Sequence, residues 1–397
     1  MRFAILSMGT LVLIALSACI RPSTPIDPSD APSIAAGAVS TILGRSPGYP
    51  PRFAEAPSEG STTVRVWYPD HPLMRRLAMP ETRAAFAEAH PGVQLEAQNI
   101  GEWMYAVQKL TVHLAGGGLP DIAIVRRDLL AQLAPSGKLV ALEALLPPEF
   151  LEDLEPPVMS AFSVGGALVA LPADAYHSVL FLDAKATLDR VEDLGSPLSP
   201  TRLTAGHIPF LEVMWAHGGD VLADGAVVVD DQAAAATFRL LHALYAGESG
   251  LSDRYAVFDE THGLALFTSG RVPLTVASSR MYRRILEEKP DTQVRSMPGE
   301  FSGISRWGAY AIVVLDEAEA SPEAIAAVLD FLTGADLQGA DALVGGSPPV
   351  RRSVRATVDP GHPLLSTFHD AIAPPLVPEW GEIEAALLGI VERVSRF

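Results

Sequence analysis

The sequence predicts an α/β fold divided into two lobes, and three observations support this prediction. Expected strands and helices alternate from residue 62 onward, which is typical of a largely parallel sheet. Removing an 18-residue leader from the 397 residues leaves 379, which is too many for one ordinary hydrophobic core and enough for two. Apolar residues make up 48% of the chain, so both cores can be filled.

The first element is a leader over residues 1–18. It combines Arg2 with an apolar run and ends in Leu16-Ser17-Ala18 before Cys19, a pattern typical of a secretory signal peptide. Small residues directly before a cysteine resemble the bacterial lipobox, in which the thiol takes a diacylglycerol and the leader is removed. Cys19 is therefore the predicted lipidation site. An uncleaved signal anchor is the alternative, because about 18 apolar residues lie at the lower limit of a membrane span.

Cys19 is the only cysteine of the chain, so its acylation would leave the mature protein without a thiol or a disulfide. Residues 19–61 follow, rich in Pro, Ser, Ala and Gly and without a sustained apolar period. We expect this stretch to be an extended tether that holds the folded body away from the membrane.

The folded body begins with alternating strands and helices. Strands are expected over 63–68, 93–97 and 121–125, separated by helices over 81–89 and 103–114 and followed by a helix over 128–134. Gly165-Gly166 predicts the turn of a hairpin. Later helices are expected over 211–216, 232–245, 261–268, 282–288, 321–333 and 382–396, with strands over 178–182, 272–277 and 310–315.

The net charge of the chain argues against nucleic-acid binding. The chain has 29 basic and 47 acidic residues, a formal net charge of −18, which repels nucleic acid and anionic lipid surfaces. After the leader, no second run of 18 apolar residues occurs, so we expect the remainder to be soluble and the membrane to be a partner only through the N-terminal lipid.

Several short motifs follow one another in a fixed order along the chain. They are Ala89-His90-Pro91-Gly92-Val93, Leu119-Pro120-Asp121-Ile122, and the stretches 137–142, 166–172, 218–219, 267–274 and 346–351. Their order resembles family 1 of the extracellular solute-binding proteins, the receptors that supply ABC importers with solutes, notably sugars. The resemblance covers roughly residues 62–388. This chain departs from the family in two places: it has no helix start of the Thr-Trp-Asp-Glu type, and it has only a short stretch over 194–206 where the family has a longer helical excursion.

This resemblance implies a two-lobed periplasmic-binding-protein-like fold with hinge crossovers near 173–176, 275–278 and 316–321 and a ligand cleft between the lobes. Lobe 1 would hold 62–174 plus 277–316, and lobe 2 would hold 175–276 plus 317–397. It also implies an extracytoplasmic binding subunit, not an enzyme, with a small solute and an ABC permease as partners. Whether a sugar-type ligand is bound for transport or for sensing stays open.

A sugar site needs flat aromatic faces together with side chains that hydrogen-bond hydroxyl groups. Aromatic and polar residues at strand ends and crossovers are the candidates, although each aromatic ring could equally belong to a core. Arg280, with Arg306, would also suit a carboxylate or phosphate, so a sugar phosphate or sugar acid is an alternative ligand. The candidate ligand-binding residues are Trp67, Tyr68, Asp70, Trp103, Tyr176, Ser278, Arg280, Trp307 and Trp380.

Enzyme signatures are missing from the sequence. No Gly-x-Ser-x-Gly, His-Glu-x-x-His, Ser-x-x-Lys or Gly-x-x-x-x-Gly-Lys motif occurs, so we predict no catalytic residue and no cofactor. His207 and His217 come closest to a metal-binding pair, but scattered histidines are ordinarily structural and no metal site is predicted. An envelope sensor or assembly lipoprotein with the same fold, or an anchored hydrolase, is the alternative function.

Overall fold

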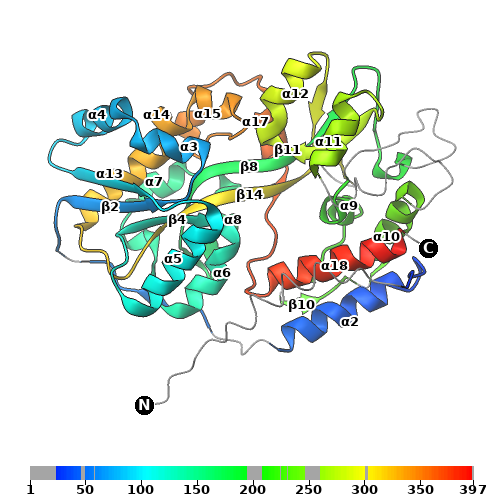
Figure 1. Ribbon diagram of the computed structural model, residues 1–397, viewed down its shortest axis with the longest axis horizontal. Coiled ribbons are helices and arrows are strands. Elements are labelled where there is room, and N and C mark those ends of the chain that lie inside the picture. The colour runs from blue at the N-terminus through cyan, green and yellow to red at the C-terminus, as the bar shows by residue number, and fades with distance from the viewer. Residues whose placement is uncertain are drawn as a thin grey trace.

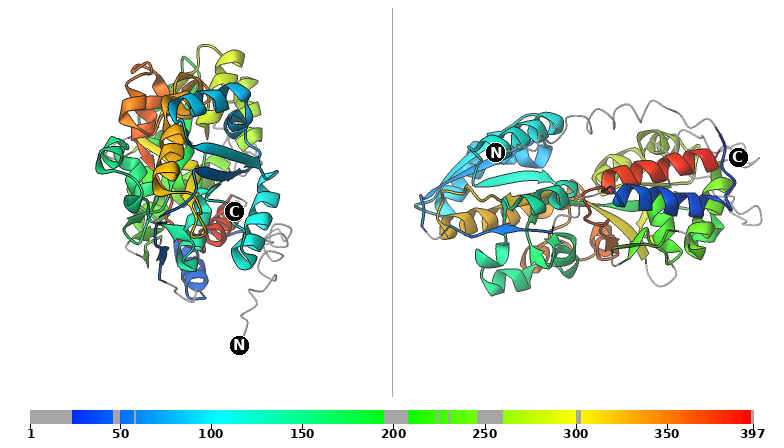
Figure 2. Two further views of the ribbon diagram at one scale, coloured as in Figure 1. Left: turned by 90° about the vertical axis from the view of Figure 1, so that its left-hand side faces the viewer. Right: turned by 90° about the horizontal axis from the view of Figure 1, so that it is seen from below.

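The computed structural model describes residues 24–45, 50–57, 59–194, 208–223, 225–229, 231–245, 260–299 and 303–395. The leader and Cys19 lie outside these residues. Figures 1 and 2 show two halves along the longest axis, joined by two long strands. We call the half around strands β2, β3 and β4 lobe 1, and the half around helices α10 and α18 lobe 2; each has its own hydrophobic core. The predicted two-lobed α/β fold is confirmed.

Lobe 1 is built on three parallel strands, β2 (Thr63–Tyr68), β3 (Gln94–Asn99) and β4 (Ile122–Arg126). In β2, the side chains of Val64, Val66 and Tyr68 are buried and the residues between them are half-exposed, as a strand with one face on a core requires. Helices α4 (Pro80–Ala89) and α5 (Trp103–Gly116) connect the strands, as the alternating sequence pattern predicted.

Two long antiparallel strands, β8 (Leu171–Leu182) and β14 (Gly303–Val314), pass from one lobe to the other. In lobe 1, β14 pairs with β4. In lobe 2, β8 pairs with β11 (Leu274–Ser278) and β12 (Gln293–Arg295). The strand order β11-β8-β14-β4-β2-β3 therefore continues through the waist of the molecule.

The expected division of the chain between the lobes is wrong at its second and third crossovers. β11 lies in lobe 2, since it pairs with the lobe-2 half of β8, and the return to lobe 1 is made by β14. Helix α13 (Pro322–Thr333) packs in the lobe-1 core, although it was assigned to lobe 2. An apolar run shows that a strand is buried, but it does not show with which strand it pairs.

The expected extended tether is also wrong over residues 31–43. Residues Ala31–Leu43 form helix α2, whose buried residues Ala31, Ala35 and Val39 recur every fourth position. This spacing places one narrow apolar stripe on the helix, and the stripe packs with α18 (Trp380–Val394) in the lobe-2 core. Figures 1 and 2 show α2 and α18 side by side.

Other local predictions are confirmed. Gly165 and Gly166, with φ of 59° and 87°, form the turn between β6 (Ser163–Val164) and β7 (Ala167–Leu168). The helix expected over 321–333 is α13, and Ser321 caps it by accepting a hydrogen bond of 3.2 Å from the backbone N of Ala324. No helix in the described part of the chain has the length and apolar character that a membrane crossing requires.

The remaining α-helices are short or cover the lobes from outside. They are α3 (Pro72–Arg75), α6 (Leu130–Leu133), α7 (Pro148–Asp153), α8 (Pro156–Ala161), α9 (Phe210–Ala216), α10 (Gln232–Tyr245), α11 (Glu260–Thr268), α12 (Tyr282–Glu288), α14 (Ala335–Gln338), α15 (Ala340–Val344), α16 (Arg352–Arg355) and α17 (Pro363–His369). The minor strands are β1 (Phe53–Ala54), β5 (Leu139–Val140), β9 (Leu222–Ala223), β10 (Ala226–Val227), β13 (Met297–Pro298) and β15 (Ala371–Ile372).

Candidate functional site

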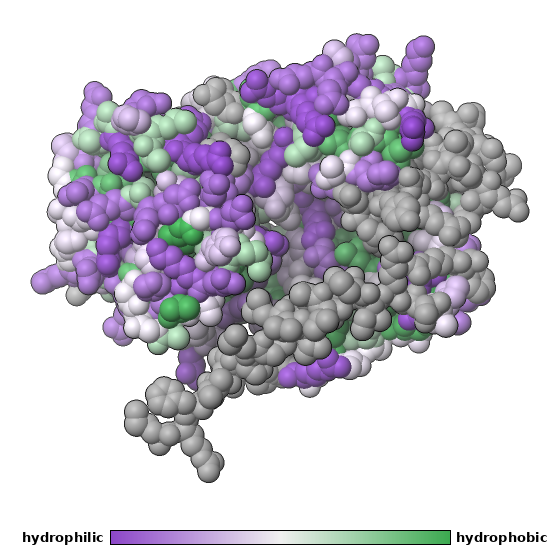
Figure 3. All heavy atoms as spheres, in the orientation of Figure 1, coloured by the Kyte–Doolittle hydropathy of each residue, from purple (hydrophilic) through white to green (hydrophobic). Residues whose placement is uncertain are grey.

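A cavity of about 250 Å³ lies where β8 and β14 enter lobe 2, and we call it the interlobe cavity because these two crossover strands line it. Figure 3 shows that the surface is hollowed between the two halves. The cavity combines aromatic rings, carboxylates and one guanidinium, the mixture that sugar recognition requires. Its lining includes Tyr176, His177, Ser178, Glu212, Glu260, Ser278, Arg306 and Trp307.

Trp307 is the most informative side chain of this cavity. It stands opposite His177 across the β8–β14 pair, and its ring centroid lies 4.7 Å from that of Phe368 and 5.9 Å from that of Phe162. The residue is only 3% exposed, yet its indole Nε1 has no hydrogen-bond partner among the described residues. A buried N–H without an acceptor costs about 1–3 kcal/mol. A ligand oxygen that accepts this hydrogen bond would remove that cost.

Arg306, next to Trp307, is already paired. Its guanidinium nitrogen lies 2.6 Å from a carboxylate oxygen of Glu384 on α18. Burial alone would lower the pKa of Arg306, but the negative charges of Glu384 and Glu212 raise it above its ordinary value. Arg306 therefore keeps its positive charge in the cavity wall, and the nearby carboxylates balance that charge.

A second cluster links the lobes beside the cavity, centred on the fully buried Asp174. Its carboxylate accepts hydrogen bonds from the guanidinium of Arg280, which follows β11 in lobe 2, and from the hydroxyl of Ser347. The Nε2 atom of His71, which follows β2 in lobe 1, lies 3.3 Å from the same carboxylate. Burial lowers the pKa of His71 despite the opposing effect of Asp174.

Arg280 also stacks on an aromatic ring of the cavity wall. Its guanidinium carbon lies 3.7 Å from the ring centroid of Tyr176, a close cation–π contact. Ser278 caps the turn that carries Arg280, because its hydroxyl accepts a hydrogen bond of 3.3 Å from the Arg280 backbone N. The cluster thus fixes the orientation of Tyr176 toward the cavity.

The structure brings together five of the nine candidate residues. Tyr176, Ser278 and Trp307 line the cavity, and Arg280 lies on the Tyr176 ring. Trp103 stands at the lobe-1 side, because its ring makes an edge contact of 6.0 Å with Tyr310, whose ring lies 5.7 Å from the Arg280 guanidinium.

The other four candidates lie elsewhere. Tyr68 is 2% exposed in the lobe-1 core, and Trp380 is 6% exposed in the lobe-2 core. Asp70 is bound by Arg75, with an Nε to Oδ1 distance of 2.7 Å. Trp67 lies on the opposite face of β2 from Tyr68, as the twofold alternation of a strand dictates.

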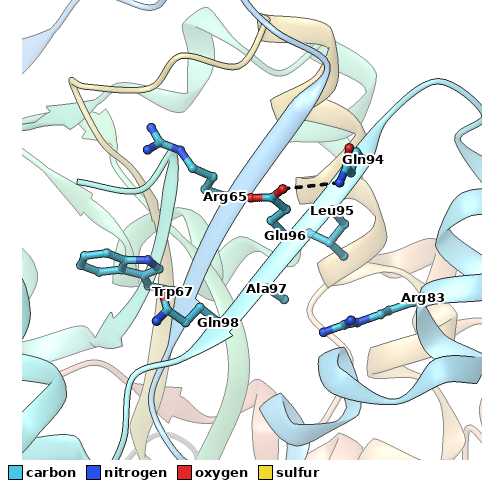
Figure 4. A pocket seen from close by; sticks show the side chains of 8 residues that line it. All are labelled: Arg65, Trp67, Arg83, Gln94, Leu95, Glu96, Ala97 and Gln98. Carbon is cyan, nitrogen blue, oxygen red and sulfur yellow. Dashed lines mark hydrogen bonds between the residues drawn. The ribbon is translucent and has the colours of Figure 1, made fainter. Parts of the chain in front are cut away.

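Trp67 belongs to a different hollow, of about 370 Å³, along the edge strand β3 (Figure 4). Its ring lies 4.9 Å from that of His113 and 4.1 Å from the ammonium of Lys109. A third hollow, of about 600 Å³, lies beside Arg127, whose guanidinium donates to the carbonyls of Ala161 and Pro374. Neither hollow is lined by the crossover residues that line the interlobe cavity.

Sequence reasoning missed several members of the site. Asp174 and His71 carried no motif, and only the tertiary fold joins them. Glu212 did carry a signal, since it is the only charged residue in the apolar helix α9. His207 and His217 were the two histidines that came closest to a metal-binding pair in the sequence. The ring of His217 contacts the hydroxyl of Thr237 at 3.0 Å, and His207 lies outside the described residues.

Comparisons with known proteins bear on the family and on the fold. Residues 81–363 match the sequence profile of the bacterial extracellular solute-binding proteins. A binding protein of Brucella abortus (strain 2308) is 24% identical over 367 residues, which cover 83% of this chain and 88% of that protein.

Solved structures with a similar fold come from three other bacteria. The cyclic alpha-maltosyl-1,6-maltose binding protein of Arthrobacter globiformis has a TM-score of 0.68 at 20% identity, covering 85% of this chain and 96% of that one. The sugar-binding protein MalE of Xanthomonas citri has a TM-score of 0.68 at 19% identity, with coverages of 84% and 92%. The GacH receptor of Streptomyces glaucescens has a TM-score of 0.65 at 19% identity, with coverages of 85% and 96%. These likenesses establish the fold.

Proposed function

Because the chain belongs to the bacterial extracellular solute-binding proteins, we propose that it is a lipid-anchored receptor that binds a neutral carbohydrate between its lobes and delivers it to an ABC permease. Members of this family bind a substrate outside the cytoplasm and do not convert it. The chain is accordingly a binding protein and not an enzyme. Three features of this function are proposals: the carbohydrate ligand, the lipid anchor and delivery to a permease.

One observation carries the proposal: the unpaired indole N–H of Trp307 in the wall of the interlobe cavity. It stands on a crossover strand, so a ligand that binds it also touches the hinge. Two neighbouring carboxylates, Glu212 and Glu260, supply acceptors for hydroxyl groups. Tyr176 supplies an aromatic face. These residues lie on lobe 2 and on the crossover strands. Closure would add contacts from lobe 1 to a bound ligand, and those additional contacts would favour the closed state.

The charges favour a neutral ligand over the anionic alternative. Arg280 is bound to the buried carboxylate of Asp174, and Arg306 is bound to Glu384. The charge of each guanidinium is thus already balanced by a carboxylate, which weakens its attraction for a phosphate. The further carboxylates of Glu212 and Glu260 would repel an anion.

The volume of the cavity and the structural relatives both favour a carbohydrate as the ligand. A cavity of about 250 Å³ lies just below the range of about 300–1,000 Å³ that holds drug-sized ligands, so it suits a small sugar. The GacH receptor was solved with acarbose, and the Arthrobacter globiformis protein is described as binding a cyclic maltosyl-maltose. These names support carbohydrate as the ligand class.

The lipid anchor rests on the sequence Leu16-Ser17-Ala18-Cys19. Intact mass measurement of protein purified from the membrane fraction should find acyl chains on Cys19 and no residue before it. The Cys19→Ser variant should retain its leader and lose the acyl mass.

Ligand class is tested by thermal unfolding of a chain that begins at residue 20, which keeps helix α2. Neutral sugars and their phosphates are added separately. A true ligand at 100 times its dissociation constant should stabilise the protein by about 2.7 kcal/mol. Stabilisation by the phosphates alone would contradict the proposal. Trp103→Ala and Arg280→Ala then show whether affinity depends on the lobe-1 aromatic side or on the Arg280 cluster.

A further inference from the structure

Helix α2 ties the N-terminal segment of the chain to lobe 2. The backbone N of Ile26 donates to the carbonyl of Arg393 at 3.2 Å, and the Arg393 side chain donates to the carbonyl of Thr24 at 2.8 Å. The Arg393 contacts are exposed and contribute little by themselves. The main attachment is apolar, because Ile26, Ala31 and Val39 are at most 3% exposed within the lobe-2 core.

The attachment begins close to the predicted acylated residue. Five peptide steps separate Cys19 from Thr24, and a fully extended chain of that length reaches about 18 Å. A free tether over residues 19–61 would instead have a root-mean-square span of about 35 Å and could reach several times further. The docked helix therefore removes most of the freedom that the composition of this segment predicted.

The docking point is far from lobe 1. Figures 1 and 2 show the N-terminal end of α2 at the outer end of lobe 2, beside the C-terminal end of α18. The helix has 13 residues and so runs about 20 Å toward lobe 1. After it, the chain enters lobe 1 at β1, which pairs with β5 through Phe53 and Leu139.

We propose that lobe 2 is the membrane-held lobe, because the α2–α18 contact keeps its outer end within a short reach of the bilayer. This inference rests on the proposed acylation of Cys19. It adds an orientation that neither the lipid anchor nor the fold alone implies. A net charge of −18 opposes binding of the folded body to anionic lipid, so a neutral headgroup layer is the surface that tests the reach of the lipid anchor.

Energy transfer from each lobe to the bilayer tests this orientation. Cys19 is the only cysteine, and acylation occupies its thiol, so single cysteines can be labelled without background. The acylated full-length protein is prepared with Arg239→Cys on α10 in lobe 2 or Gln108→Cys on α5 in lobe 1; both positions are exposed. Each variant is placed on phosphatidylcholine vesicles that contain an acceptor-labelled headgroup.

We expect the Arg239→Cys label to be quenched at least about twofold more than the Gln108→Cys label, given the short reach from Cys19 to Thr24. Equal quenching, or stronger quenching of the lobe-1 label, would overturn the inference. A 20-residue Gly-Ser linker inserted between Ile20 and Thr24 should reduce the lobe-2 signal, since it leaves α2 docked and lengthens only the reach.

The matched control places the same linker after Arg45, between α2 and lobe 1. Quenching of the lobe-2 label should not change there, because the path from Cys19 to lobe 2 is unaltered. If this control insertion lowers the lobe-2 signal, the segment is not docked and the inference fails. Protein without acyl mass on Cys19 would overturn the lipid anchor and the orientation together, whereas ligand binding is measured separately and is not affected by either result.

Discussion

Trp307 and Trp380 are both buried, and each carries an indole N–H without a hydrogen-bond partner in the described part of the chain. Their surroundings differ. Trp307 lines the interlobe cavity, whereas Trp380 begins α18 inside the lobe-2 core. Both are candidate ligand-binding residues in the sequence analysis. The sequence does not show which of them lies at the site, because both follow segments without a regular apolar period.

This pair permits a controlled test of the site. Trp307→Phe keeps an aromatic ring but removes the N–H, so ligand affinity should fall about tenfold, the value of one hydrogen bond. Stability of the free protein should stay equal or rise, because an unpaired buried donor is removed. Isothermal titration and urea unfolding measure the two effects. Trp380→Phe should leave affinity unchanged, and a comparable loss of affinity there would refute the assignment.

His177 makes stability depend on pH. It is fully buried, and burial lowers its pKa to about 3. The unfolded chain protonates His177 near pH 6.5, whereas the folded chain keeps it neutral down to about pH 3. The free energy of unfolding must therefore fall as the pH drops below 6.5. Between pH 7 and pH 5 the loss from this residue should be about 2 kcal/mol.

Urea unfolding at pH 7, 6 and 5 measures this loss in the wild type and in His177→Gln. The difference between the two proteins should shrink as pH falls. His369→Gln, at an exposed position, is the control and should keep the wild-type pH dependence. A parallel pH dependence of wild type and His177→Gln would contradict the explanation.

At the level of elements, strands β8 and β14 build both the hinge and the cavity wall. Gly308 on β14 faces Tyr176 on β8, and a Cβ atom at position 308 would lie 2.2 Å from a carbon of the Tyr176 ring. The missing side chain at Gly308 therefore makes room for the ring on which Arg280 stacks. A side chain at position 308 would displace the Tyr176 ring and, with it, the Arg280 guanidinium that pairs with Asp174.

Gly308→Ala should lower stability by about 1–3 kcal/mol and weaken ligand binding, because the Tyr176 ring must move. Thermal unfolding and titration with the identified sugar are the measurements. Gly389→Ala, in the interior of α18, is the matched control, because no atom outside the backbone of that helix lies within 4 Å of the added Cβ. That variant should gain about 0.5–1 kcal/mol and bind normally. Normal binding by Gly308→Ala would argue against a role for Tyr176.

Helix α2 shows how packing can override composition. Its sequence is rich in small residues, but the buried Ala31, Ala35 and Val39 form a stripe that fits closely against α18. Val39→Ala should reduce the free energy of unfolding by about 2 kcal/mol because it leaves a cavity in the lobe-2 core. The exposed neighbour Ser40→Ala should change it by less than about 0.5 kcal/mol. Chemical unfolding curves that show equal effects would mean that α2 is not docked in solution.

For the molecule as a whole, the core of lobe 1 is separate from the two core clusters of lobe 2, and β8 and β14 pass between the lobes. This arrangement allows the lobes to move as units about the waist. Ligand that contacts both lobes should shift the population toward the closed form. X-ray scattering of the chain beginning at residue 20 should therefore show a smaller radius of gyration when a saturating sugar is added. The Trp307→Phe variant at the same sugar concentration should show a smaller change. Identical profiles with and without a proven ligand would remove hinge closure from the mechanism.

The sequence by itself determined the local elements and the family, because these depend on periodicity, turn residues and motif order within short stretches. It located β2, α5, the Gly165-Gly166 turn and the helix that begins at Ser321, and it placed Tyr176 at the first crossover. Only the tertiary structure decided strand partners, the docking of α2 and the pairing of Asp174 with Arg280. These join residues distant in the chain, and a hydrophobic pattern records that a surface is buried without recording what buries it.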